Sequence, residues 1–317
     1  MHIPDGFLDA KTLITTGALS AGGLAVAIRQ VNRILPRKKI PLMGLSAAFV
    51  FAAQMLNFPV AGGTSGHLLG GVLVSVLLGP AAAAIVIACV LMIQALLFSD
   101  GGVLALGANI FNMSFVGAVC GYAIYQSARR FLPGLRGRIT AVFFASWLST
   151  VLASVTCAGE LSLSGTLAPG VVFPAMVSVH MLIGIGEGLI TSLVILAIAQ
   201  TRPDLLDPEH QERARNVGFE FVLIGLIVAL GLAIFVSPYA CSWPDGLDKV
   251  AEKFGFAGRA GTTLKTFFPD YKIPGISSAG IATAIAGALG TAIMFGLACV
   301  IGRVLVRDKV QTETSDK

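Results

Sequence analysis

The sequence predicts an all-α protein, a polytopic bundle of transmembrane helices. Of its 317 residues, 55% are hydrophobic and only 12% are charged, whereas about a quarter of the residues in a soluble domain are charged. The hydrophobic residues form runs of membrane-spanning length rather than an amphipathic pattern. The 37 glycines suit the close approach of helices in lipid. No basic stretch with interleaved aromatic residues indicates nucleic-acid binding, so the lipid bilayer is the partner that composition predicts.

About nine runs are expected to span the membrane. They are residues 12–29, 40–57, 67–80, 81–98, 107–126, 139–157, 171–199, 217–237 and 276–302. The third and fourth meet at Gly79-Pro80, which breaks a helix or marks a tight turn.

A charged linker with several prolines, residues 200–216, separates the first seven runs from the last two. We therefore expect two parts, a membrane core at 1–215 and an accessory hairpin at 216–317. In the hairpin, residues 238–275 form a loop between two spans, and residues 249–255 are expected to form a short exposed helix.

The basic residues predict the orientation. With nine spans, most of the 22 lysines and arginines fall on one side, in segments 29–39, 127–138 and 200–216 and after residue 302. Cytoplasmic loops carry an excess of lysine and arginine. We therefore expect the N-terminus outside and the C-terminus in the cytoplasm.

The first two residues, Met1 and His2, place an α-amine, a backbone amide and an imidazole close together. Amine and amide can close a five-membered chelate ring around a metal ion, and amide and Nδ1 can close a six-membered one. Such a claw is planar and suits metals that accept square-planar nitrogen ligands, above all Ni(II) and Cu(II). One corner stays open for a fourth ligand.

The claw requires a free and uncleaved Met1. Residues 1–11 carry Asp5 and Asp9 but no basic region ahead of an apolar one, so they do not resemble a signal peptide. A bulky second residue such as His2 also usually protects the initiator methionine. The alternative is a frayed terminus that happens to contain a histidine, because disorder concentrates at chain ends.

His67 is the candidate for the fourth ligand. In the predicted topology it lies at the outer end of the third span, on the same side as Met1 and His2. Glycines surround it in segment 61–71, and they let another stretch of backbone approach closely. The alternative is an ordinary polar residue at headgroup level.

Five further polar residues are candidates with less specific signals. Asp100, Asn109 and Asn112 lie near the outer ends of the fourth and fifth spans, where they could orient His67 or the N-terminal loop or form ordinary turns and caps. His180 and Glu187 lie inside the seventh span and share a helix face. Ionisable groups at membrane depth are functional candidates, but we favour a structural hydrogen-bond role for this pair.

The sequence lacks the motifs that several classes of protein require. There is no GxxxxGK[ST] phosphate loop and no HExxH zinc-protease motif, so the chain is expected to be neither an ATPase nor a metalloprotease. The five cysteines show no CxxC spacing, so no zinc or iron–sulfur framework is expected. An ATP-independent secondary metal permease stays open as an alternative, with His180 and Glu187 as its intramembrane ligands.

Two long motifs carry a resemblance. Segments 1–8 (MHIPDGFL) and 62–71 (GGTSGHLLGG) resemble the CbiM/NikM family, the substrate-binding (S) components of energy-coupling-factor (ECF) transporters for nickel and cobalt. The likeness covers about residues 1–215 and continues through 100–102, 106–113 and 180–191. Residues 217–317, with PDGLD at 244–248, resemble the NikN-like accessory component fused to that core.

The resemblance implies a function for these residues. In this family four nitrogens hold the metal in a plane, here the Met1 amine, the His2 amide and imidazole, and the His67 imidazole. The metal, Ni(II) or Co(II), is the transported substrate, and no organic cofactor is implied. A separate transmembrane coupling (T) component and cytoplasmic ATP-binding subunits are implied as partners, in the plasma membrane of a prokaryote. Asp5 looks more like the nickel branch, and cobalt uptake for cobalamin synthesis by the same mechanism is the alternative.

Overall fold

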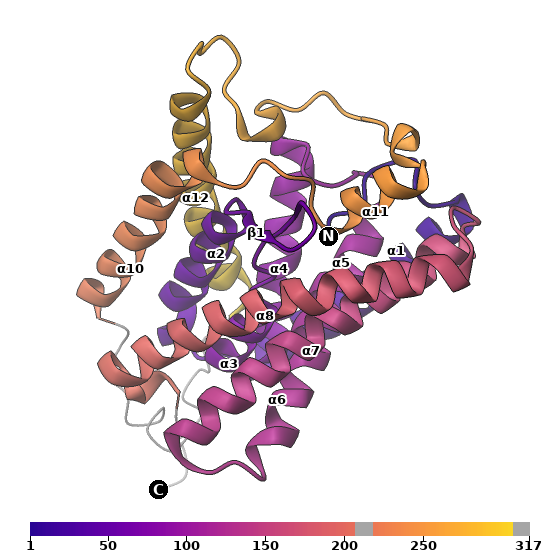
Figure 1. Ribbon diagram of the computed structural model, residues 1–317. Helices are drawn as coiled ribbons and strands as arrows, with labels where there is room; N and C mark the ends of the chain where they lie inside the picture. Colours follow the sequence, from indigo (N-terminus) through magenta and orange to yellow (C-terminus); the bar gives the residue numbers. More distant parts are fainter. Residues whose placement is uncertain (207–217, 307–317) are drawn as a thin grey trace, which may run out of the picture.

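The computed structural model describes residues 1–206 and 218–306 as a bundle of helices with a small β-hairpin (Figure 1). The α-helices are α1 (Ala10–Ile34), α2 (Ile40–Gln54), α3 (Gly71–Leu78), α4 (Pro80–Ile93), α5 (Leu106–Ile110), α6 (Gly121–Arg129), α7 (Gly134–Leu163), α8 (Pro169–Thr201), α10 (Phe219–Gly231), α11 (Gly246–Phe254) and α12 (Ala279–Leu305). The antiparallel hairpin pairs β1 (Phe58–Val60) with β2 (Thr64–Gly66). The expected boundary between the two parts, at residue 215, lies outside the described residues.

Short stretches of π-helix extend or join several helices. Gln94–Phe98 extends α4, Leu232–Val236 extends α10, and Phe111–Cys120 joins α5 to α6. A π-helical turn shifts the side chains that follow it around the helix axis, and such turns often occur at functional sites.

The prediction of an all-α, polytopic membrane protein is confirmed. Among the described residues, seven helices are long and apolar enough to cross a membrane. They are Ala10–Ile34, Pro80–Phe98, Leu106–Arg129, Gly134–Leu163, Pro169–Thr201, Phe219–Tyr239 and Ala279–Leu305. Each corresponds to one of the nine predicted runs. The second run forms α2, which has 15 residues.

The third predicted span differs most from its prediction. Residues 67–80 contain only the eight-residue helix α3, which is about 12 Å long, whereas the hydrocarbon core is about 30 Å thick. The residues before it are not helical, and Gly70 adopts a φ of 75°, which favours glycine. His67 therefore lies inside the protein on non-helical backbone rather than at the end of a complete span.

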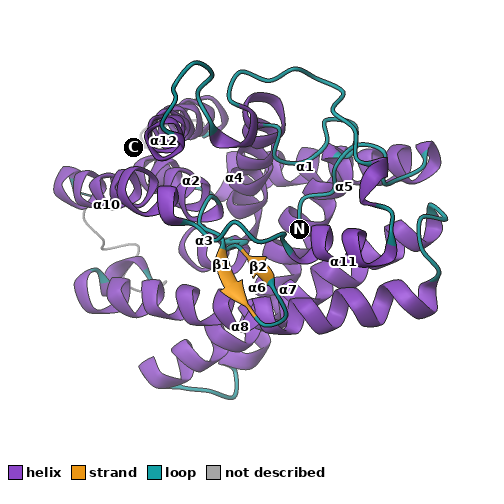
Figure 2. Ribbon diagram, turned by 45° about the horizontal axis from the view of Figure 1, so that its top comes forward, coloured by secondary structure: helices purple, strands orange, loops and turns teal. Residues whose placement is uncertain are grey.

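The accessory part shares the hydrophobic core of the rest. α7 packs along α8, and α12 packs against α2 and contacts α10 (Figures 1 and 2). Leu247 and Val250 of α11 and Met294 of α12 belong to the same buried cluster as residues of α3 and α4. α11 begins earlier than expected and buries one face instead of being wholly exposed. α10 buries only Ala229 among its 13 residues, as expected for a helix that faces lipid.

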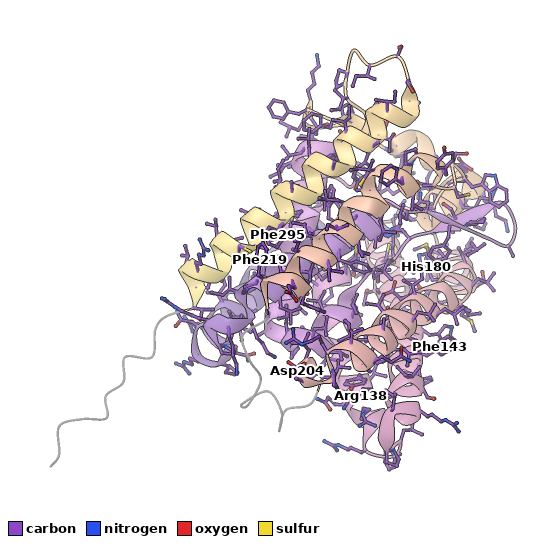
Figure 3. The ribbon with its side chains drawn as sticks, turned by 90° about the vertical axis from the view of Figure 1, so that its left-hand side faces the viewer. Arg138, Phe143, His180, Asp204, Phe219 and Phe295 are labelled. Atoms are coloured by element: carbon purple, nitrogen blue, oxygen red, sulfur yellow. The ribbon has the colours of Figure 1, made fainter. Side chains whose placement is uncertain are left out.

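Basic residues gather at one end of the bundle. Lys38, Lys39, Arg129, Arg130 and Arg138 line a cleft of about 1040 Å³. Figure 3 shows Arg138 and Asp204 toward the lower end of the bundle, apart from His180. The structure thus brings the predicted cytoplasmic segments 29–39 and 127–138 together, while the orientation in the membrane stays a prediction.

Candidate metal centre

The first residues of the chain are buried inside the bundle. Met1, His2 and Ile3 are 3%, 8% and 0% exposed, respectively, and Figure 2 shows the N-terminus in the middle of the view, with helices around it. A frayed end would expose these residues. The structure therefore places the terminus as a packed element, and its polar groups must find partners inside the protein.

A side chain of α5 holds the backbone of this N-terminal segment. Asn109 accepts a hydrogen bond from the Ile3 amide at 2.7 Å and donates to the Ile3 carbonyl at 3.0 Å. The same carbonyl accepts from the Gly102 amide at 2.9 Å. Asp5 accepts from the Leu104 amide at 2.9 Å. These bonds fix how far the first two residues reach into the bundle.

The α-amine and His67 meet at the end of this segment. The Met1 nitrogen lies 2.7 Å from His67 Nε2. Two adjacent nitrogens in a plane around one ion, each about 2.0 Å from it, lie about 2.8 Å apart. The Leu68 carbonyl accepts from His67 Nδ1 at 3.1 Å, which leaves the lone pair on Nε2 toward the amine. One donor pair of the predicted site is thus at coordination spacing.

His2 is oriented by two polar side chains. Its Nε2 lies 3.2 Å from Gln94 Oε1, and a proton on Nε2, donated to that oxygen, leaves on Nδ1 the lone pair that a chelate requires. Asp100 Oδ1 lies 3.1 Å from that Nδ1 and Oδ2 accepts from the Tyr271 hydroxyl at 2.5 Å. A lone pair facing a carboxylate is satisfied by a proton or a cation between them. The His2 and His67 ring centroids are 5.0 Å apart.

The environment keeps both imidazoles neutral. Burial, together with the charged α-amine, lowers the pKa of His2 and the pKa of His67 to about 3. Burial raises the pKa of Asp100 above its ordinary value. Neutral imidazole is the form that binds metal ions. The two rings therefore need not lose a proton before they bind a metal ion.

Asp245 supplies a negative charge from the accessory part. Its Oδ2 lies 2.7 Å from the Met1 amine and 4.0 Å from His67 Nε2. Burial raises the pKa of this carboxyl, but the amine and His67 outweigh burial, and the pKa lies well below its ordinary value. Asp245 was not predicted as a site residue, because no local pattern indicates which part of the 238–275 loop reaches the terminus.

Glu187 caps the backbone that carries His67. Its two carboxylate oxygens accept from the amides of Leu69, at 2.6 Å, and Gly70, at 3.0 Å. These amides precede α3 and have no partner in that helix.

Asn112 donates to Glu160 of α7 at 2.7 Å, whereas Asn109 contacts the N-terminal segment directly. The three polar residues near the outer span ends thus have different surroundings.

His180 supports the accessory part rather than the metal donors. Its Nδ1 donates to the Met176 carbonyl at 2.8 Å. Gly246 packs on the ring, and a Cβ at that position would lie 2.7 Å from His180 Cε1. Only glycine fits such an approach without a shift. The structure thus gives His180 a packing contact with the accessory part, and the structural role favoured for the pair from the sequence stays a prediction.

The candidate donors are two backbone nitrogens and two imidazoles. Among the described residues, no group of three or more His, Cys, Asp or Glu side chains could hold a metal ion. The candidate donor set contains only two such side chains, His2 and His67, because its other two donors are backbone nitrogens. Two further residues of the site were not predicted from the sequence. Gln94 is a polar residue in an apolar run, which is a usable signal, whereas Tyr271 carries no such signal.

Two family models match the chain. The model for the cobalt uptake substrate-specific transmembrane region (CbiM) matches residues 2–205, and the PDGLE domain model matches residues 219–307. Asp248 stands at the last position of the PDGLE motif.

Relatives match across both parts. The putative fused nickel transport protein NikMN of Archaeoglobus fulgidus is 36% identical over 306 residues, 96% of this chain and 98% of that protein. The fused nickel transport protein NikMN of Rhodobacter capsulatus is 32% identical, with 83% and 80% covered. The cobalt transport protein CbiM of Geobacter sulfurreducens is 31% identical, with 80% and 77% covered. A crystal structure of a transition metal transporter is 35% identical, with a TM-score of 0.59, and covers 69% of this chain and 100% of that one.

We expect acid to undock the N-terminal segment. The docked pKa of His2 and His67 is about 3, below the ordinary value of about 6.5, so the undocked form binds more protons as the pH falls. At pH 5 this favours undocking by about 2 kcal/mol for each imidazole. Hydrogen exchange of residues 1–8 in metal-free protein, corrected for intrinsic rates, should show protection lost between pH 7 and pH 5. Unchanged protection there, relative to α12, would contradict the expectation.

Replacing Glu187 by glutamine should loosen the His67 segment. The glutamine amide group would face a backbone N–H, and an unsatisfied buried donor costs about 1–3 kcal/mol. We expect a lower unfolding temperature and about tenfold weaker Ni(II) binding by calorimetry. Glu220→Gln, at an exposed position in α10, is the matched control and should change neither. Wild-type behaviour of Glu187→Gln would show that the cap is dispensable.

Proposed function

The chain belongs to the family of cobalt uptake substrate-specific transmembrane proteins, and within that family we propose that it binds Ni(II) for uptake into the cell. The ion is held by the Met1 amine, the His2 amide and imidazole, and the His67 imidazole. The supporting observation is the buried α-amine 2.7 Å from His67 Nε2. Burying a charged amine costs free energy unless the amine is paired.

The donor set favours nickel over cobalt as the cargo. Four nitrogens in a plane, one of them a deprotonated amide, suit a square-planar Ni(II) ion. The names of two relatives that span both parts of the chain point the same way, since both are described as nickel transport proteins. Co(II) uptake for cobalamin synthesis by the same mechanism is the second candidate, and a cobalt transport protein is among the relatives.

We propose that the chain is the substrate-binding component of an ECF-type transporter. Its sequence has no phosphate loop, so ATP hydrolysis falls to separate cytoplasmic subunits, joined through a transmembrane coupling component. The excess of basic residues at one end supports a plasma-membrane orientation with that end in the prokaryotic cytoplasm and the metal site toward the outside.

An ATP-independent permease is less well supported. Such a protein needs ionisable ligands that the ion can reach within the spans. Here both oxygens of Glu187 accept backbone amides, and Gly246 covers the ring of His180. Both carboxylate oxygens of Glu187 and Nδ1 of His180 are thus bonded to backbone groups, while Nε2 of His180 is buried without a hydrogen-bond partner among the described residues.

Adding one residue before Met1 should abolish high-affinity Ni(II) binding. The addition moves the amine away from His67 and puts a peptide nitrogen in its place. We expect the affinity to fall by at least about a hundredfold, the range reached even by losing an outer-shell partner, with the protein still folded. His67→Ala should weaken binding by a similar factor. Calorimetry with wild type and both variants measures it.

The control is the same residue inserted between Leu132 and Pro133, in the loop at the basic end. This insertion should leave Ni(II) affinity unchanged. If the N-terminally extended protein binds Ni(II) as tightly as wild type, the proposed donor set is wrong.

Uptake should depend on ATP hydrolysis by the partner subunits. In proteoliposomes with the coupling component and ATP-binding subunits, internal Ni(II) should rise with ATP and not with a non-hydrolysable analogue. Uptake by this chain alone, driven by an ion gradient, would instead support the permease.

A further inference from the structure

The loop of the accessory part lies along the whole N-terminal segment. The Gly261 amide donates to the Asp5 carbonyl at 2.9 Å, and the Thr263 hydroxyl donates to the Asp5 carboxylate. The Phe256 ring packs edge-on against Phe7, with centroids 5.0 Å apart. The accessory part therefore contacts the segment at residues 1, 5 and 7, in addition to the Asn109 bonds at Ile3.

Residues 243–248 are themselves fixed independently of the N-terminus. The Ser65 amide donates to the Pro244 carbonyl at 2.9 Å, and the Ser65 hydroxyl donates to the Trp243 carbonyl at 2.7 Å. Gly246 packs on His180, and Leu247 is fully buried. This turn is a firm support because its anchors lie on the β-hairpin and on α8.

The two oxygens of Asp245 have different tasks. Oδ1 accepts from the amides of Leu247, at 2.8 Å, and Asp248, at 2.9 Å, and so caps α11. Oδ2 accepts from the Met1 amine at 2.7 Å. The cap fixes the carboxylate, and the carboxylate in turn fixes the direction of the amine.

The geometry is compatible with a bound ion. An α-amine bound to a metal keeps two N–H bonds. Loss of one proton from the charged amine leaves a lone pair for the ion, while a remaining N–H bond can still point at Asp245. A carboxylate that accepts from a ligand orients that ligand and balances the charge of the ion.

We propose that Asp245 of the accessory part is the positioning residue of the metal site: it holds the Met1 α-amine beside His67 before and after the ion binds. This inference rests on the proposed function, because it assigns the partner of a proposed ligand. It gives the fused accessory part a direct share in binding the cargo.

Asp245→Asn separates the two tasks. Asparagine caps helices as well as aspartate does, so α11 should persist. With its oxygen at the cap, its NH₂ group faces the amine and cannot accept from it. We expect faster hydrogen exchange of residues 1–8 in the metal-free protein. Ni(II) affinity should fall about 10- to 100-fold, the usual cost of losing an outer-shell partner of a metal ligand. Asp245→Ser, which also caps, should behave in the same way.

The control is Glu252→Gln, which removes a negative charge from an exposed position one turn further along α11. It should leave both the exchange and the affinity at wild-type values. Exchange of the α11 amides reports the cap in every variant.

The outcomes separate this inference from the proposed function. If wild type binds Ni(II) tightly and Asp245→Asn matches it in affinity and exchange, the positioning role is wrong and the donor set stands. If Asp245→Asn also loses protection in α11, loss of the cap accounts for the effect and the assignment is overturned. If wild type itself binds no Ni(II), the proposed function fails first.

Discussion

The structure depends on burying the N-terminal segment, with its charged amine, inside a helical bundle. A buried chain end needs a partner for every polar backbone group and a counter-charge for the amine. Asn109 and Gly102 meet the backbone of Ile3. Asp245 supplies the charge. Each of these groups lies about a hundred or more residues away in the sequence, so the terminus can dock only once the bundle has formed.

Two irregular helices make room for this segment. α3 begins only after Gly70, which leaves His67 on non-helical backbone within the protein. α4 ends in a π-helical turn that begins at Gln94, the partner of His2. Regular helices through both regions would place these side chains elsewhere around their axes. The departures from ideal helix geometry therefore occur where the candidate site needs them.

The intramembrane ionisable groups belong to the support of the site. Glu187 accepts the two amides that the shortened α3 leaves without helical partners. His180 receives Gly246 of the accessory turn. A buried carboxylate and imidazole in a membrane span usually suggest a path for ions, but here their contacts are with backbone. The structure thereby links the core, the N-terminal segment and the accessory loop through one set of contacts.

Composition and run length determined the class of this protein, because a chain with so few charges and such long apolar runs can fold only in a membrane. The Met1-His2 pair and the glycine-flanked His67 were also visible in the sequence, because chelate geometry is local and glycine-rich segments stand out. The short α3 was not, since its apolar residues suit a complete span equally well. Nor were the roles of Asp245, Gln94 and Tyr271. Their contacts join segments 92 to 244 residues apart. Only tertiary packing brings such segments together, and no local sequence pattern indicates that packing.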